Sequence, residues 1–176
     1  MSNLIVRPAR AADAAAIAEI VIAGWRAGYQ SILNADYISS AAFESARRQQ
    51  WRAFEGGRPG LIVAEARGVV VGWASYGEPR QSEGPGVGEL WGLYVDPDHW
   101  GTGAADALVH GVLSGLAAGG FQRATLWVLQ DNPRARTFYR KSRFADTGRS
   151  RLRDFGDAGS ATEVEMVRPL ADFVSD

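Results

Sequence analysis

The segment from residue 89 to residue 129 limits the possible folds more than any other part of the chain. Apolar residues at 89–95 predict a strand, an amphipathic pattern at 103–118 predicts a helix, and the run RATLWVL at 123–129 predicts a second strand. Two strands joined by a long crossover helix are expected to be parallel. The chain should therefore contain a helix-covered sheet with a parallel pair.

Patterns on either side of this unit predict the remaining elements. They are a strand at 4–9, a helix that follows Asp13 as its N-cap, a second helix from about 36 to 54, strands at 61–66 and 69–77 around a tight Arg67-Gly68 turn, a loop at 78–88, a helix at 133–142, and closing strands near 144–150 and 161–168. We expect one α/β domain over residues 1–176, with the order β-α-α-β-β-β-α-β-α-β-β and a mixed sheet.

Residue spacing predicts one buried face on each of the two N-terminal helices. The first helix places Ile17, Ile20, Val21 and Trp25 on one side, and the second repeats Phe43, Arg47 and Trp51 at every fourth position.

Composition excludes several classes of function. The 176 residues contain no cysteine, which excludes disulfides and thiol nucleophiles and fits a reducing, cytoplasmic setting. No apolar run approaches the roughly 18 residues of a membrane span, and the N-terminus is charged too early for a secretory signal. A net charge of -1 provides no field for nucleic acid, and two histidines leave little for a metal site. We therefore expect a small-molecule site, without metal, membrane or nucleic acid.

The turn WGTGAA at 100–105 joins the strand at 89–95 to the next helix. It lacks the lysine of a phosphate-binding Walker loop, and Asp106 stands where a dinucleotide fingerprint has its third glycine. Two interpretations remain open. The turn is either a plain strand-to-helix connection or an anion cradle, in which glycines let a ligand oxygen approach the helix amides and Thr102 adds a hydroxyl or a cap.

A second motif, NPRARTFYRKSRF at 132–144, begins with Asn132 as a helix N-cap and Pro133 at the first helical position. Together the two motifs resemble the GNAT superfamily of acyl-CoA-dependent N-acyltransferases. The cofactor loop of that family reads (Q/R)-x-x-G-x-(G/A), and its later motif reads N-x-x-A-x-x-F-Y-x-K-x-G-F. This chain departs from both motifs. Trp100 stands where the family usually has Gln or Arg, and Arg143 stands where it usually has Gly.

The resemblance covers nearly the whole chain and implies a GNAT-like fold with a splayed central sheet. It implies an acetyl-CoA site with the pyrophosphate on the amides of residues 101–106 and the pantetheine along 93–95, made by Leu93, Tyr94, Val95, Trp100, Gly101, Thr102, Gly103, Ala104, Ala105, Asp106, Asn132, Phe138 and Tyr139. Gly92 fits a distorted strand, although it would also make room for Trp73 or Trp91.

Direct acyl transfer to an amine needs a base and an acid. Glu89 is the candidate base, because strand alternation places it on the face of Trp91, Leu93 and Val95, where burial would raise its pKa. The alternative is a solvated carboxylate at a strand end. Tyr139 is the candidate acid for the leaving thiolate, a role that family members give this tyrosine, and the alternative is a core aromatic residue beside Phe138.

The acceptor site is the least defined part of this interpretation. By the resemblance it lies between the first helices and the central strand, with Trp25, Tyr29, Trp73 and Tyr76 as its lining, joined by Arg26, Trp51 and the 78–88 loop. His99 is expected at the cofactor rim and His110 in a structural place. The leading function is an acetyl-CoA-dependent N-acetyltransferase for a small-molecule or peptide amine, and the resemblance allows a homodimer. The alternative is an acyl-CoA sensor or assembly module without turnover.

Overall fold

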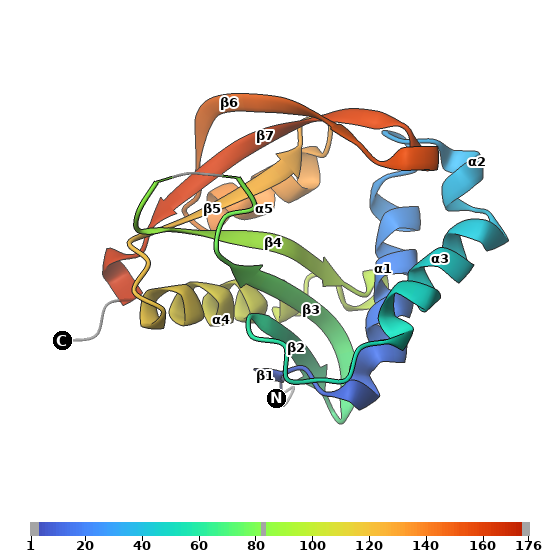
Figure 1. Cartoon of the computed structure of the whole chain (residues 1–176), viewed down its shortest axis with the longest axis horizontal. Helices are drawn as coiled ribbons and strands as arrows, with labels where there is room; N and C mark the ends of the chain where they lie inside the picture. The colour runs from blue at the N-terminus through green and yellow to red at the C-terminus, as the bar shows by residue number, and fades with distance from the viewer. Residues whose placement is uncertain (1–3, 82–83, 174–176) are drawn as a thin grey trace.

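The parallel pair expected from residues 89–129 lies inside a seven-stranded mixed sheet of order β1-β2-β3-β4-β5-β7-β6 (Figure 1). The computed structural model describes residues 4–81 and 84–173. Its main elements are β1 (Leu4–Pro8), α1 (Ala14–Gly28), α2 (Ala35–Ile38), α3 (Ala41–Arg52), β2 (Leu61–Ala66), β3 (Val69–Gly77), β4 (Val87–Val95), α4 (Ala104–Ala118), β5 (Arg123–Leu129), α5 (Pro133–Lys141), β6 (Ala145–Asp154) and β7 (Ser160–Pro169). Short 3₁₀ turns are η1 (Ala11–Asp13), η2 (Pro97–His99), η3 (Gly156–Ala158) and η4 (Ala171–Phe173).

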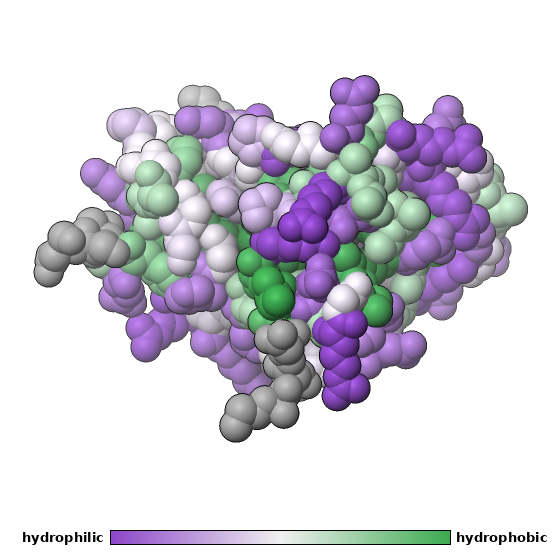
Figure 2. Space-filling model, turned by 90° about the horizontal axis from the view of Figure 1, so that it is seen from below, coloured by the Kyte–Doolittle hydropathy of each residue, from purple (hydrophilic) through white to green (hydrophobic). Residues whose placement is uncertain are grey.

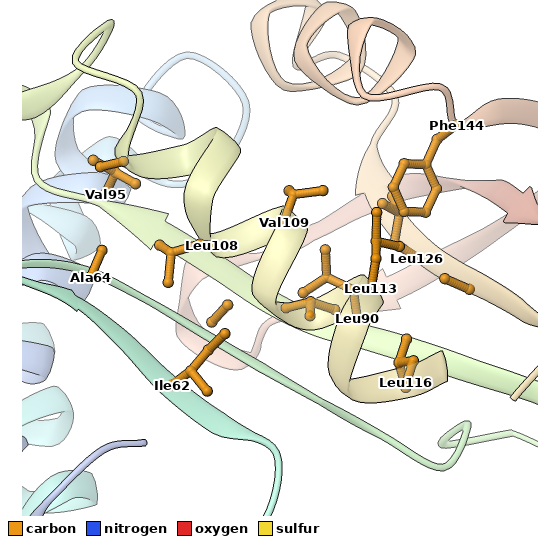
Figure 3. Close-up of a cluster of buried hydrophobic side chains, with 14 of the residues drawn as sticks. Ile62, Ala64, Leu90, Val95, Leu108, Val109, Leu113, Leu116, Leu126 and Phe144 are labelled. Carbon is orange, nitrogen blue, oxygen red and sulfur yellow. The ribbon is translucent and has the colours of Figure 1, made fainter. Parts of the chain in front are cut away.

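Helix α4 covers one face of the sheet with a continuous apolar stripe. Leu108, Leu113 and Leu116 of α4 are almost fully buried against Leu90 of β4 and Leu126 of β5. Figure 3 shows these side chains between the helix and the strands. Burying one such leucine contributes about 1.5–3 kcal/mol, so this layer holds the β4-α4-β5 crossover in place.

Helices α1 and α3 cover the opposite face and form a second, more aromatic cluster. The predicted inward residues of α1 are buried, and Trp25 packs against Phe43 of α3 with ring centroids 5.3 Å apart. Trp51, two turns further along α3, packs against Trp73 of β3 at 5.3 Å. The expected spacing of α3 is thereby confirmed.

The prediction of one helix from 36 to 54 is wrong, because the chain forms two helices there. The Oδ1 of Asn34 accepts a hydrogen bond from Tyr37 N, and the Oγ of Ser40 accepts one from Phe43 N, each at 3.2 Å. Each side chain caps the start of its own helix, α2 and α3. Polar residues at 39–40 thus end one helix and begin the next.

Asp13 does not cap α1 with its side chain, contrary to expectation. Its carboxylate instead pairs with Arg7 of β1, with Nη1 and Oδ2 2.7 Å apart, and accepts a hydrogen bond from Arg10 N at 2.7 Å. The hydrogen bond from Arg7 lowers the pKa of Asp13. The residue therefore ties the end of β1 to the 3₁₀ turn that precedes α1.

The hairpin of β6 and β7 is longer than the sequence indicated. Its outer half alternates charged residues that pair across the strands, such as Arg151 with Glu163 at 2.7 Å and Arg149 with Glu165 at 3.0 Å. Cross-strand pairs of this kind stabilise a hairpin that has few apolar residues. The end of the hairpin reaches α2, where Asn34 N donates to Ala158 O at 2.9 Å, so it arches over the space beside β4 (Figure 1).

The tight turn at Arg67-Gly68 is confirmed, since both residues have positive φ and antiparallel β2 and β3 meet there. β4 begins at Val87, two residues before the predicted start at 89. Residues 82–83 of the expected loop lie outside the described residues.

Large apolar side chains that stay exposed belong to separate elements. They are Ile5 on β1, Val69 on β3, Trp100 before α4 and Leu152 on β6. The face shown in Figure 2 accordingly mixes small apolar groups with hydrophilic residues. Within the described residues, no helix is both long enough and apolar enough to cross a membrane.

Arg143 occupies a position where glycine is favoured. It follows α5 with φ of 63°, and two hydrogen bonds close the helix there, from Arg143 N to Arg140 O and from Phe144 N to Tyr139 O, both at 3.0 Å. This is a Schellman motif, in which the residue after the cap adopts the left-handed conformation. The Arg143 departure from the GNAT pattern therefore strains the backbone locally.

We predict that Arg143→Gly raises the free energy of unfolding by about 1 kcal/mol, because glycine lacks the Cβ that disfavours this conformation. Denaturant unfolding measures the difference. Arg143→Ala is the control, since it also loses the exposed pair with Asp172 but keeps the strain. Equal stability of the glycine and alanine variants would contradict this account.

Candidate functional site

Strands β4 and β5 separate halfway along their length. They pair in parallel from Val87 with Arg123 to Leu90 with Leu126, and no further. Opposite β3, Ser75 pairs with Gly92 and Tyr76 with Leu90, so Trp91 is an extra residue in β4. A bulge of this kind bends the strand. The backbone of β4 from 91 to 95 therefore has no strand partner on its β5 side, as expected for a splayed sheet.

Gly92 lies directly after the bulge. A Cβ built on it would find its nearest neighbour, Cη2 of Trp73, at 3.6 Å, an ordinary contact distance. Gly92 is therefore not required to make room for Trp73, and its place beside the bulge favours the alternative of a distorted strand.

The bulge also overturns the face expected for Glu89. Leu90 packs in the same cluster as Leu93 and Val95, below α4 (Figure 3). Because neighbouring strand residues point to opposite faces, Glu89 projects away from Leu93 and Val95, onto the α1 and α3 side. The carboxylate is also buried, with 4% of the residue exposed, so it is not the solvated strand-end group of the alternative.

The separated strands open into a cleft of about 650 Å³. It brings together most of the residues expected for a cofactor: Leu93, Tyr94, Val95, Trp100, Gly101, Gly103, Ala105, Asp106, Asn132, Phe138 and Tyr139. Trp25, Tyr29, Trp51 and Trp73, expected for an acceptor, line the same cleft. Thr102, Ala104, Glu89 and Tyr76 are not part of this lining.

The glycine turn leaves the start of α4 open. Gly101 and Gly103 have φ of 77° and 89°, and a Cβ at either position would meet no atom within 4 Å. Gly103 is the N-cap residue of α4 and no side chain caps the helix. Thr102 does not cap the helix, because its hydroxyl donates a hydrogen bond to His99 O at 2.7 Å. The first amides of α4 are available to an anion.

The start of α5 lies in the same cleft. Asn132 caps it as expected, with Oδ1 accepting from Ala135 N at 3.0 Å. Arg134 places its guanidinium carbon 3.0 Å from the ring centroid of Trp100, whose Nε1 donates to Val95 O at 2.9 Å. Trp100, which stands where the GNAT loop usually has Gln or Arg, therefore has the guanidinium of Arg134 against its ring.

Three tyrosines surround the gap between the strands, Tyr29, Tyr94 and Tyr139. Burial raises the pKa of Tyr139 above the ordinary phenol value, and the phenol of Tyr94 adds to the rise. Burial also raises the pKa of Tyr29, again with a contribution from Tyr94. All these shifts disfavour the phenolate, so Tyr139 carries its proton at neutral pH. Its ring also packs 5.3 Å from that of Phe138.

Glu89 supports the edge of the cleft from below. Its Oε2 accepts a hydrogen bond from Arg80 N at 2.8 Å. The side chain of Arg80 lines the cleft and lies over the ring of Trp91, 5.5 Å from the centroid. The carboxylate therefore holds a loop residue that contacts the cleft.

Tyr76 was wrongly expected in the acceptor pocket. It packs in the α4 cluster, and a Cβ on Gly115 of α4 would collide with its hydroxyl. Trp73 and Tyr76 are three residues apart on one strand, an odd spacing that puts them on opposite faces. Arg26 also lies outside the cleft lining and pairs with Glu44 at 2.6 Å.

Other cleft residues were not singled out for the site from the sequence. They include Arg47 and Gln50 of α3, Ser75 of β3, Trp127 of β5, Arg134 of α5, and Arg153, Phe155 and Glu163 of the β6–β7 hairpin. Arg80 also lines the cleft and belongs to the 78–88 loop that was expected at the acceptor site. The alternation of arginines at 149, 151 and 153 was the available signal for the hairpin, because charges at a period of two share one strand face. His99 lines the cleft at the rim, as expected, and His110 packs against Phe173. The described residues contain no group of potential metal ligands.

Comparison with protein families gives a match to the Acetyltransferase (GNAT) family over residues 26–144. An uncharacterized N-acetyltransferase of Bacillus subtilis, YuaI, is 30% identical over 129 residues, which cover 73% of each chain. The L-amino acid N-acyltransferase MnaT of Escherichia coli is 34% identical over 108 residues, or 59% of this chain and 58% of that protein.

A solved structure has the same fold. The acetyltransferase yncA of Salmonella typhimurium, determined with its cofactor acetyl-CoA, superposes with a TM-score of 0.64, at 22% identity, over 98% of this chain and 96% of its own.

Proposed function

Because the chain belongs to the GNAT family of acetyltransferases, we propose that it transfers an acetyl group from acetyl-CoA to a primary amine in a direct ternary complex. Membership establishes an acetyl-CoA-dependent N-acetyltransferase. What we propose beyond family membership is that the acceptor is a primary amine and that transfer takes place directly in a ternary complex. The observation that carries them is the single cleft, which joins the glycine turn and the aromatic pocket through the gap between β4 and β5.

The residues present fit coenzyme A. The open amides of α4 suit a pyrophosphate, and the β4 backbone at 91–94, which has no strand partner on its β5 side, suits the amides of a pantetheine arm. We propose that Arg134 supplies the cation that Trp100 lacks. In support, Arg134 lines the cleft against the ring of Trp100, and among the described residues it makes no ion pair.

We predict that coenzyme A raises the melting temperature much more than pantetheine, which has no phosphate. At a hundredfold excess over Kd, binding adds about 2.7 kcal/mol, or roughly 5–10 °C for a domain of this size. Arg134→Gln should weaken coenzyme A binding by about 10- to 100-fold and leave pantetheine unchanged.

The matched control is Arg140→Gln on the same helix, where the exposed arginine pairs with Asp146. Equal stabilisation by coenzyme A and pantetheine would exclude the anion cradle. Equal losses in the two arginine variants would exclude the role of Arg134.

We propose that Tyr139 is the general acid. Acetyl-CoA supplies an acetyl group activated as a thioester, and the absence of cysteine leaves no thiol for an acyl-enzyme. The phenol Oη of Tyr139 holds the proton that the departing sulfur needs. Its raised pKa keeps that proton in place, and burial in the same cleft would also raise the pKa of a thiol.

Tyr139→Phe retains the ring that packs beside Phe138 and removes only the hydroxyl. We predict that turnover falls by roughly 10²- to 10⁴-fold, while the shift of melting temperature by coenzyme A is unchanged. A smaller loss is expected with a thioester whose leaving thiol is more acidic. Near-native turnover would show that the ring only packs.

We propose that Glu89 is the base, taking the proton of the amine through water. In support, the carboxylate is buried, and it accepts a hydrogen bond from Arg80 N, whose residue lines the cleft. Glu89→Gln should lower turnover by roughly 10²- to 10⁴-fold with little change in melting temperature, because the amide oxygen still accepts from Arg80 N. Initial rates over pH measure this effect. Full activity would exclude Glu89 as the base.

We propose that the acceptor is a small-molecule or peptide amine. The aromatic lining, to which the β6–β7 hairpin adds Arg153 and Phe155, supports a compact acceptor, and the name of MnaT describes a relative that acts on amino acids. We also propose that the protein is cytoplasmic, where acetyl-CoA is present, and that it forms a homodimer.

A further inference from the structure

Two buried N–H groups in the acceptor part of the cleft have no hydrogen-bond partner. They are Nε of Arg47 and Nε1 of Trp73, among the few such side-chain atoms in the described residues. Trp73 is only 6% exposed. Leaving a buried donor unpaired is unfavourable, because the group has lost its hydration without gaining a partner. Donors of this kind inside a binding cleft indicate that a ligand supplies the acceptor atoms.

Arg47 differs from the neighbouring arginines. Arg26 pairs with Glu44 at 2.6 Å, and Arg48 pairs with Glu19 and Glu44 at 2.6 and 2.9 Å. For Arg47 the described residues provide no ion pair. Its guanidinium carbon instead lies 5.7 Å from the ring centroid of Trp25 and 5.5 Å from that of Phe43. Aromatic faces hold the cation in place without neutralising it.

Contacts between the aromatic rings connect the two donors. Arg47 and Trp51 are one turn apart on α3 and share a face, and Trp51 packs 5.3 Å from Trp73. On the other side, Nε1 of Trp25 donates to the hydroxyl of Tyr94 at 3.2 Å, and Tyr94 stacks on Trp73 at 5.2 Å. The two donors therefore belong to one rigid aromatic group.

The charges in this part of the cleft favour a negative group. Arg47 and Arg80 contribute cations. Glu163, which also lines the cleft, is already paired with Arg151 at 2.7 Å and Arg153 at 3.0 Å. A polyamine would meet repulsion here, whereas an acceptor that carries a carboxylate would meet a complementary charge.

We infer that the acceptor carries a carboxylate in addition to its amine, and that Arg47 and Trp73 bind this carboxylate. The inference rests on the proposed function and names its substrate class. A carboxylate has two oxygens that accept from two donors at once, and a bond to a charged group is stronger than a neutral one. Small amino acids have the required pair of groups.

Binding to the enzyme saturated with coenzyme A tests the inference without turnover. The probes are L-alanine, L-methionine and L-phenylalanine, each compared by calorimetry with its primary amide and with spermidine. The amide keeps the amine and side chain, loses the negative charge, and replaces one acceptor oxygen by an NH2 group. At least one acid should bind about 10- to 100-fold more tightly than its amide. Spermidine should bind more weakly than that acid.

The variants locate the effect. Arg47→Gln should remove the preference for the acid, and Trp73→Phe should reduce it, because it keeps an aromatic ring but removes the Nε1 donor. Arg48→Gln, on the next position of α3, is the matched control and should keep the full preference. The shift of melting temperature by coenzyme A should be unchanged in all three, which reports intact folding and an intact donor site.

The inference is overturned if no acid binds, if amides or spermidine bind as well as the acids, or if Arg47→Gln keeps the preference. Free thiol release with the same compounds and acetyl-CoA separates the two proposals. Acids that bind through Arg47 but are not acetylated would support the carboxylate site and contradict the proposed acyl transfer.

Discussion

The separation of β4 from β5 is the structural constraint on which the site depends. The two strands are parallel, so their carboxyl ends lie at the same edge of the sheet, and each is followed by a helix that starts there. The N-termini of α4 and α5 therefore meet at the gap. If the strands stayed paired, their backbone groups would satisfy one another, and nothing could enter between them. The extra residue Trp91 ends that pairing after Leu90.

The two faces of the sheet give the two ends of the cleft different chemistry. On one side lie open helix amides and Arg134, which suit phosphates. On the other side lie packed aromatic rings with an arginine held among them. The tyrosines stand between, buried enough that their pKa values rise. One cleft thus contains the regions that we propose for the acetyl donor and the acceptor, with the proposed general acid between them.

Local signals in the sequence predicted the elements that depend on local chemistry. The crossover, the glycine turn, the cap at Asn132 and the buried face of α1 were all predicted correctly, because periodicity and capping act over a few residues. Most residues that the family resemblance implied for the cofactor line one cleft, and their role in binding it stays a prediction.

The errors arise where one residue changes the register or a helix is interrupted. Alternation placed Glu89 with Leu93, but the bulge at Trp91 reverses the face, and a bulge has no clear signal in a single sequence. Ser40 divided a helix whose apolar spacing continued on both sides. The sequence indicated Arg47 only by its four-residue spacing from Phe43 and Trp51, because the lack of a hydrogen-bond partner for its Nε depends on tertiary contacts.

Hydrogen exchange with and without acetyl-CoA tests the central claim most directly, because it reports where the backbone becomes protected. The account predicts slower exchange for amides in segment 91–95 of β4 and in 101–106 at the start of α4, with β1 and β2 unchanged. Unchanged exchange in both segments, with saturating acetyl-CoA bound elsewhere, would contradict the account that the gap between β4 and β5 is the donor site.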